Sequence, residues 1–139
     1  GYTVRRADAL VGLGASAISD VGGVYAQSHK DLGPYRAALD AGRLPTARGL
    51  ARSAEDERRR AVIAAIMTRG ALPAAVLAEY PAERARLADF ERDDLLSFAP
   101  DGALTTTQLG RLFVRNIAMV FDQHLTKQPA ERPLFSQTV

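Results

Sequence analysis

The residues best suited to hold a ligand lie in one glycine-rich stretch near the start of the sequence. Gly12 and Gly14 follow the short apolar run 9–11, and residues 15–17 are all small. Two glycines one residue apart allow a sharp turn and the close approach of a ligand or another segment. Strand ends rich in small residues are where α/β proteins place ligands. Spacing alone favours a connecting loop, and a ligand site stays open as the alternative.

A dinucleotide-binding loop is a second interpretation of this stretch. Gly12, Gly14 and Ala17 fit the pattern G-x-G-x-x-G/A, which must open a helix to hold a pyrophosphate. The adjacent Gly22 and Gly23 follow too closely, and a pair of glycines breaks a helix. This missing context argues strongly against the fingerprint.

Other catalytic and metal-binding patterns have little support. Ser16 and Ser19 lack a histidine base nearby, so a Ser-His-Asp triad is not indicated. His29 and His124 are far apart and lack a metal-ligand spacing, which favours structural or surface roles. The chain contains no cysteine, which excludes disulfides, thiolate metal sites and cysteine nucleophiles within it.

Composition limits the fold and the partners. A chain of 139 residues with 47% hydrophobic residues suits one domain, or a small domain with an appendage. The formal net charge of +2 is too small to indicate nucleic acid or an anionic membrane as a partner. We expect no membrane span, because no apolar run reaches about 18 residues. The start at Gly1, just before a predicted strand, suggests a piece of a larger protein.

The first fifty residues predict little regular structure. We expect a buried strand over 9–11, a second extended piece over 24–26, and an extended crossing over 44–50. Asp31 can cap a helix over 32–41, which Gly42 ends. The strand over 9–11 should pair with 24–26 or with another copy of the chain.

The remainder predicts helices and one hairpin. Ser53 and Asp56 have capping-box spacing at the start of a helix that ends at Gly70. The turn 100–102, Pro-Asp-Gly, is typical of a β-hairpin. Further helices are expected over 74–79, over 82–96, and from Thr106 or Thr107 to Leu125, before an irregular tail over 126–139.

The predicted fold class is therefore mainly α with small β, and helices followed by a hairpin suggest a winged-helix-like arrangement. A DNA-binding winged helix would read DNA with the helix around 83–94. That segment carries a net negative charge, which phosphate would repel, so DNA binding is disfavoured.

Several separate motifs resemble one enzyme family. They are GLGASAIS at 12–19, VYAQ at 24–27, LPTARGL at 44–50, RNIAMVFD at 115–122 and FSQTV at 135–139. In this order they resemble the oxygen-independent coproporphyrinogen III oxidase (dehydrogenase) family of radical S-adenosylmethionine enzymes, over essentially the whole chain. Ser28 and Gln137 depart from the family pattern, which commonly has Asn and Arg there.

The resemblance implies that the chain is the C-terminal third of a longer, cytoplasmic enzyme. Residues 1–50 would hold the last strand and loop of a radical S-adenosylmethionine barrel plus a connector. Residues 51–139 would form a helical, winged-helix-like domain that covers the active-site opening of the upstream barrel. The whole enzyme would convert coproporphyrinogen III to protoporphyrinogen IX by oxidative decarboxylation in haem biosynthesis.

The resemblance also implies the cofactors, S-adenosylmethionine and a [4Fe–4S] cluster. Without cysteines, this chain cannot ligate the cluster, so the ligands must lie upstream and the fragment alone should be inactive. The family position matching Ile18 lies against S-adenosylmethionine, with Gly14 and Ser16 forming the loop beside it. No catalytic or metal residue is expected here. The alternative is a haem-binding or haem-transfer relative without dehydrogenase activity.

Overall fold

The computed structural model describes residues 7–125, which belong to two compact units. The division falls after Glu57, within the first turns of helix α2 (Ala54–Arg69). We call residues 7–57 the sheet unit and residues 58–125 the helical unit, and describe each by itself. The domain boundary expected between residues 50 and 51 stays a prediction, and the tail over 126–139 lies outside the described residues.

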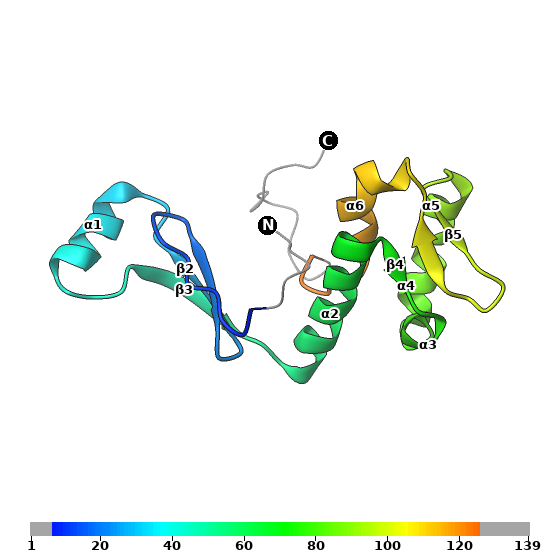
Figure 1. Cartoon of the computed structure of the whole chain (residues 1–139). Helices are drawn as coiled ribbons and strands as arrows, with labels where there is room; N and C mark the ends of the chain where they lie inside the picture. Colours follow the sequence, from blue (N-terminus) through cyan, green and yellow to red (C-terminus); the bar gives the residue numbers. More distant parts are fainter. Residues whose placement is uncertain (1–6, 126–139) are drawn as a thin grey trace. The chain divides into compact units, whose positions relative to one another are not determined.

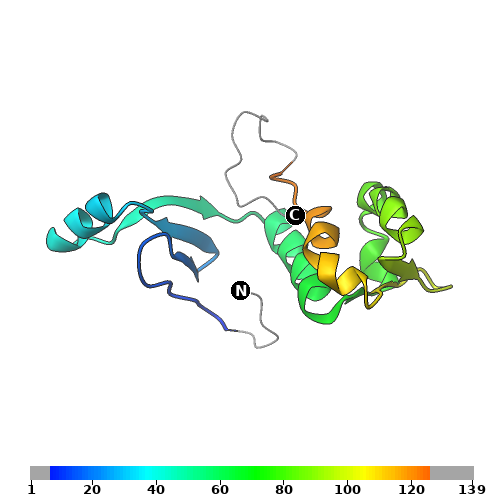
Figure 2. The same ribbon diagram turned by 90° about the horizontal axis from the view of Figure 1, so that it is seen from above.

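The sheet unit is built on a three-stranded antiparallel sheet. Its strands are β1 (Ile18–Val21), β2 (Val24–Ser28) and β3 (Thr46–Ala51), in the order β1-β2-β3, and helix α1 (Leu32–Asp40) connects β2 to β3 (Figures 1 and 2). Gly22 and Gly23 form the two-residue turn between β1 and β2, with φ angles of 57° and 79°. Positive φ at both positions is what a tight hairpin turn requires, and glycine supplies it without a steric penalty.

Two expectations for this unit were wrong. No strand was expected over the segment that forms β1, and the run 9–11 was expected to be a buried strand. In the structure Leu10 makes only an isolated bridge, and it pairs with Asp20 instead of with 24–26. Leu10 and Val11 are also exposed. A three-residue apolar run does not fix its own burial, which depends on a covering layer that the described residues do not supply.

The helical unit combines short helices with a second antiparallel sheet. This sheet has the order β4-β6-β5, with a hairpin joining β5 to β6. After α2 the elements are β4 (Ala71–Leu72), α3 (Ala74–Leu77), α4 (Pro81–Arg86), α5 (Ala88–Arg92), β5 (Leu96–Phe98), β6 (Leu104–Thr106), the 3-10 helix η1 (Gly110–Phe113) and α6 (Val114–Met119). The chain is therefore mixed α/β with small sheets, less helical than expected.

Two local features, the start of α2 and the turn between β5 and β6, agree with the sequence-based predictions. The predicted capping box starts α2, since Asp56 N–H donates to Ser53 Oγ at 3.1 Å and Ser53 N–H donates to Asp56 Oδ2 at 2.8 Å. The predicted hairpin turn is also confirmed. There Asp101 Oδ1 accepts a hydrogen bond from Ala103 N–H at 2.9 Å, and Gly102 has a φ of 91°.

Two predicted helices were too long. The helix expected over 82–96 is split at Leu87 into α4 and α5, and Leu96 already belongs to β5. The cap of the next segment, expected at Thr106 or Thr107, falls instead at Leu109, although Thr107 Oγ1 accepts a hydrogen bond from Gly110 N–H at 2.9 Å just before the segment. That segment begins as η1 and continues as α6 only to Met119. Tertiary packing of Leu87 and Leu96, both fully buried, outweighs helix propensity here.

The described core lies in the helical unit. Helices α2 and α6 lie side by side and contribute Ile66 and Ile117, which pack with Phe121 just beyond α6 (Figures 1 and 2). Arg59 of α2 joins this region to α4 at the rim of the core: it donates to Glu83 Oε1 in α4 at 2.7 Å and to the carbonyl oxygen of Phe121 at 3.1 Å. The unit thus has a contiguous apolar centre closed by charged hydrogen bonds.

Replacing Leu104 tests this core. Leu104 of β6 is fully buried, so Leu104→Ala should leave a cavity and lower the free energy of unfolding by about 2–5 kcal/mol. Leu112→Ala is the matched control, because Leu112 is 80% exposed and its loss should change stability little. Urea unfolding followed by circular dichroism measures both. Equal effects of the two substitutions would contradict the described core.

Candidate functional site

The predicted ligand loop is a tight turn held in a left-handed conformation. Gly14 has a φ of 101° and Ser16 a φ of 62°, and Ala17 N–H donates to the Gly14 carbonyl oxygen at 3.3 Å. Glycine adopts such angles freely, whereas a serine held there costs about 1–3 kcal/mol. Backbone strain of this kind persists only where the surroundings hold it in place.

The strained Ser16 is anchored on both sides of its peptide unit. Its N–H donates to the carbonyl oxygen of His29 at 2.9 Å, and its carbonyl oxygen accepts a hydrogen bond from Gln27 Nε2 at 3.1 Å. Both partners come from the end of β2 or the residue after it. The loop is therefore fixed to the sheet by β2.

The backbone at Gly12 is closely approached by another segment of the chain, not by a ligand. A Cβ atom at this position would lie 2.6 Å from the carbonyl oxygen of Ile18, closer than real Cβ atoms come. Gly12 N–H also donates to Ser19 Oγ at 3.1 Å. This glycine is needed because the chain before the loop runs directly against the start of β1.

Ile18, the residue singled out by the family resemblance, opens β1 with its side chain 53% exposed. Gly14 and Ser16 precede it in the turn, so the three predicted site residues lie in one continuous segment. An exposed isoleucine beside a rigid turn offers an uncharged surface on which an apolar group can pack. The arrangement fits a ligand contact and contains no group able to transfer a proton.

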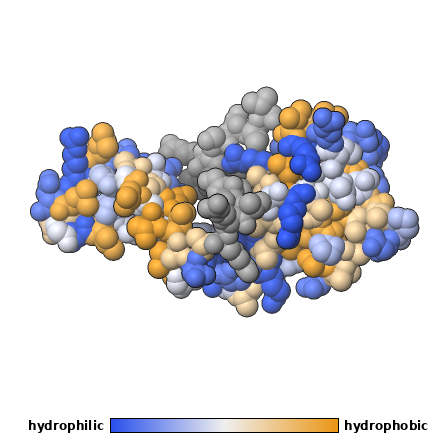
Figure 3. Space-filling view, viewed as in Figure 1, coloured by the Kyte–Doolittle hydropathy of each residue, from blue (hydrophilic) through white to orange (hydrophobic). Residues whose placement is uncertain are grey.

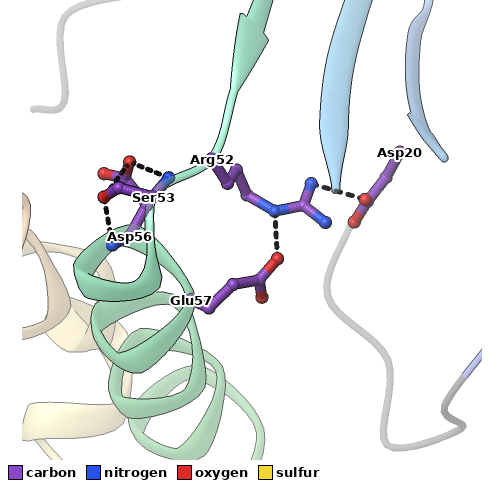
Figure 4. Close-up of polar contacts among 5 residues, drawn as sticks. All are labelled: Asp20, Arg52, Ser53, Asp56 and Glu57. Carbon is purple, nitrogen blue, oxygen red and sulfur yellow. Dashed lines mark hydrogen bonds and ion pairs between the residues drawn. The ribbon is translucent and has the colours of Figure 1, made fainter. Parts of the chain in front are cut away.

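A charged cluster of the sheet unit lies where β3 ends (Figure 4). Arg52, directly after β3, donates from Nη1 to Asp20 Oδ1 at 2.6 Å and from Nε to Glu57 Oε1 at 2.5 Å. Its guanidinium carbon also lies 4.4 Å from the ring centroid of Tyr25. The side chain of Arg52 is only 6% exposed. We call these four residues the Arg52 cluster.

Opposing effects act on the pKa of Arg52. Burial by itself lowers its pKa, but the hydrogen bonds to Glu57 and Asp20 and the charges of both carboxylates together raise it above the ordinary value. The guanidinium therefore stays cationic, and it joins β1, β2 and the first turn of α2 at one point.

The sequence did not point to the Arg52 cluster, or to Gln27 and Arg48 beside Ile18. The available signal was strand alternation over 44–52, which would place 48, 50 and 52 on one face. Identifying their partners requires the registers of β2 with β1 and with β3, which pair Gln27 with Ile18 and with Arg48.

The described residues hold no cluster of metal ligands. Within 7–125, no three His, Cys, Asp or Glu side chains converge where a metal ion could bind. None of the helices in this part of the chain is long and apolar enough to cross a membrane.

Comparison with known proteins gives a consistent set of relatives. The chain is 37% identical over 134 residues to the oxygen-independent coproporphyrinogen III oxidase of Helicobacter pylori, and covers 29% of that protein. The corresponding proteins of Pseudomonas aeruginosa and Escherichia coli are 36% and 35% identical over 148 residues, matching 100% of this chain and 32% of their own length. No family model matches the chain.

A solved structure gives the same result. The chain superposes on the coproporphyrinogen III oxidase of Escherichia coli, described as a radical SAM enzyme, with a TM-score of 0.74 and 34% sequence identity. The match covers 89% of this chain and 30% of the other. The chain thus spans about a third of the length of the relatives it matches.

The Arg52 cluster makes a testable prediction about stability. Arg52→Gln removes the cation and leaves Asp20, whose side chain is 18% exposed, without it. We expect a loss of about 1–3 kcal/mol in the free energy of unfolding of the sheet unit. Arg43→Gln is the matched control, because Arg43 lies in the same unit, is exposed, and forms no ion pair within the described residues. Denaturant unfolding compares them, and an unchanged midpoint for Arg52→Gln would refute the role of the cluster.

Proposed function

We propose that this chain, which belongs to the oxygen-independent coproporphyrinogen III oxidase family, is part of a radical S-adenosylmethionine oxidoreductase of haem biosynthesis. The observation that carries the proposal is the 34–37% identity to these oxidases across 90–100% of the chain. The structural match at a TM-score of 0.74 supports it independently. The proposed reaction of the complete enzyme is the oxidative decarboxylation of coproporphyrinogen III to protoporphyrinogen IX.

The two cofactors of such an enzyme fit this chain differently. A [4Fe–4S] cluster does not fit, because its thiolate ligands are missing from all 139 residues. We propose that another region of the complete protein ligates the cluster, and that this chain alone has no activity. S-adenosylmethionine fits the exposed Ile18 and the rigid turn at Gly14 and Ser16, where its uncharged parts can pack. When bound to a complete enzyme it would supply the radical that abstracts hydrogen from the substrate.

The fold supports separate roles for residues 1–50 and 51–139 in the proposed enzyme. Residues 1–50 would close the upstream barrel and connect it to the second part. The order α2-β4-α3, then α4 and α5, then the β5–β6 hairpin, with β4 paired to β6, supports a winged-helix-like arrangement for residues 51–139. That part would cover the active-site opening without donating catalytic groups, and the complete enzyme would work in the cytoplasm.

The alternative proposal is a haem-binding or haem-transfer relative without dehydrogenase activity. No contact in the described residues favours it over the oxidase. The two proposals differ in what the complete protein does with S-adenosylmethionine. Cleavage belongs to the enzyme, whereas haem binding without cleavage belongs to the carrier.

The first functional prediction concerns S-adenosylmethionine cleavage. The complete protein, with its cluster reconstituted under anaerobic conditions, should form 5′-deoxyadenosine when coproporphyrinogen III and a reductant are added. The 139-residue chain alone should form none, because it carries no cluster ligands. Chromatography of the products measures both. No cleavage by the complete protein would overturn the proposed activity, and haem binding in the same preparation would favour the carrier.

A second prediction concerns Ile18. In the complete enzyme, Ile18→Asp should raise KM for S-adenosylmethionine by about 10- to 100-fold, because an apolar contact is lost and a charge must be desolvated. Ile18→Leu keeps the apolar surface and should change KM only slightly. Initial rates over a range of S-adenosylmethionine concentrations test the pair. Equal KM values for Ile18→Asp and the parent would remove this residue from the cofactor site.

A further inference from the structure

Three side chains form a row across the sheet unit beside the candidate site. The register pairs Ile18 of β1 with Gln27 of β2, and Gln27 with Arg48 of β3. Residues directly opposite one another in antiparallel strands point to the same face. Arg48 therefore shares a face with Ile18, although thirty residues separate them in the sequence.

The amide of Gln27 holds Arg48 in a defined position. Arg48 Nε donates to Gln27 Oε1 at 2.8 Å, while Gln27 Nε2 donates to the Ser16 carbonyl oxygen at 3.1 Å. Gln27 thus links the arginine to the strained turn. Only the Nε side of the guanidinium is used, and its terminal Nη groups find no acceptor among residues 7–125.

Arg52, on the same face, is a structural arginine with which Arg48 can be compared. It follows Arg48 by four residues, is nearly buried, and meets the carboxylates of Asp20 and Glu57. Arg48 is exposed, and within the described part of the chain it forms no ion pair with a carboxylate. One arginine is fully compensated, whereas the other presents positive charge and free N–H donors beside Ile18.

We propose that Arg48 binds a carboxylate of a ligand bound on the sheet face that carries Ile18. The planar Nη groups of arginine match a carboxylate in a bidentate geometry, and the hydrogen bond from Nε to Gln27 orients them in advance. This inference rests on the proposed function. Two molecules of that reaction carry the required group, the amino-acid end of S-adenosylmethionine and the propionates of coproporphyrinogen III.

Equilibrium binding to the complete, cluster-containing protein tests the proposal. Arg48→Gln should raise the Kd of the carboxylate ligand by about 10- to 100-fold. Arg48→Lys keeps the positive charge but lacks the paired N–H donors of the guanidinium, so its Kd should lie between those of the parent and Arg48→Gln. Arg43→Gln is the matched control, because Arg43 is exposed in the turn after α1 and lies outside the sheet. Calorimetry with S-adenosylmethionine and fluorescence quenching of coproporphyrin III, the stable oxidised form of the substrate, give the two affinities.

Two analogues distinguish the sources of the carboxylate. If it belongs to S-adenosylmethionine, Arg48→Gln weakens that ligand but leaves the Kd of decarboxylated S-adenosylmethionine unchanged. If it belongs to the substrate, the variant weakens coproporphyrin III but not its tetramethyl ester. Unchanged affinity for both acids overturns the proposal, as does a lowered melting temperature with normal affinity, which would show that Arg48 pairs with the protein. Failure of the proposed function is seen separately, as absence of 5′-deoxyadenosine from the unsubstituted protein.

Discussion

The guanidinium of Arg52 is the contact on which the sheet unit depends. It reaches Asp20 in β1, Glu57 in the first turn of α2 and the ring of Tyr25 in β2, so one side chain joins three elements. Hydrophobic burial cannot hold these elements together, because among residues 7–57 only Ala38 is a buried apolar residue. A desolvated ion pair adds little net stability over apolar packing, but breaking one is costly. The cluster therefore fixes position more than it adds stability.

Two arginines in and just after β3 show how the surrounding residues determine the role of an arginine. Arg48 and Arg52 share a face, and each is oriented by residues of β1 or β2. Beside the row that contains Asp20 and Tyr25, the cation of Arg52 is neutralised and becomes part of the framework. Where the row contains Ile18 and the neutral Gln27, the cation keeps its charge and is held beside an apolar surface. A ligand with both an apolar part and a carboxylate matches the second row.

The structural features that could be predicted from the sequence were those determined by residues adjacent in the chain. The capping box at Ser53 and the turn at Gly102 depend on a few adjacent residues, and both were found. Strand β1 was missed because its Ser-Asp centre lacks an apolar pattern, and it exists only through pairing with β2. The family motif pointed to Ile18, but the row that adds Arg48 follows from a register between strands distant in sequence. Such pairing is not encoded in any local window.

The sheet unit also has apolar side chains exposed on both of its faces. Val21 and Val24 pair on one face and Leu50 lies with Ile18 on the other, all at least 39% exposed, and apolar surface is visible on this unit in Figure 3. Sheets with two apolar faces are normally covered on both sides. A unit of this size with almost no buried core gains little free energy of folding from hydrophobic burial. A ligand or another protein surface that covers these apolar side chains would therefore add burial that the described residues of the unit do not supply. Any molecule that binds these faces only in the folded unit would stabilise the fold by mass action.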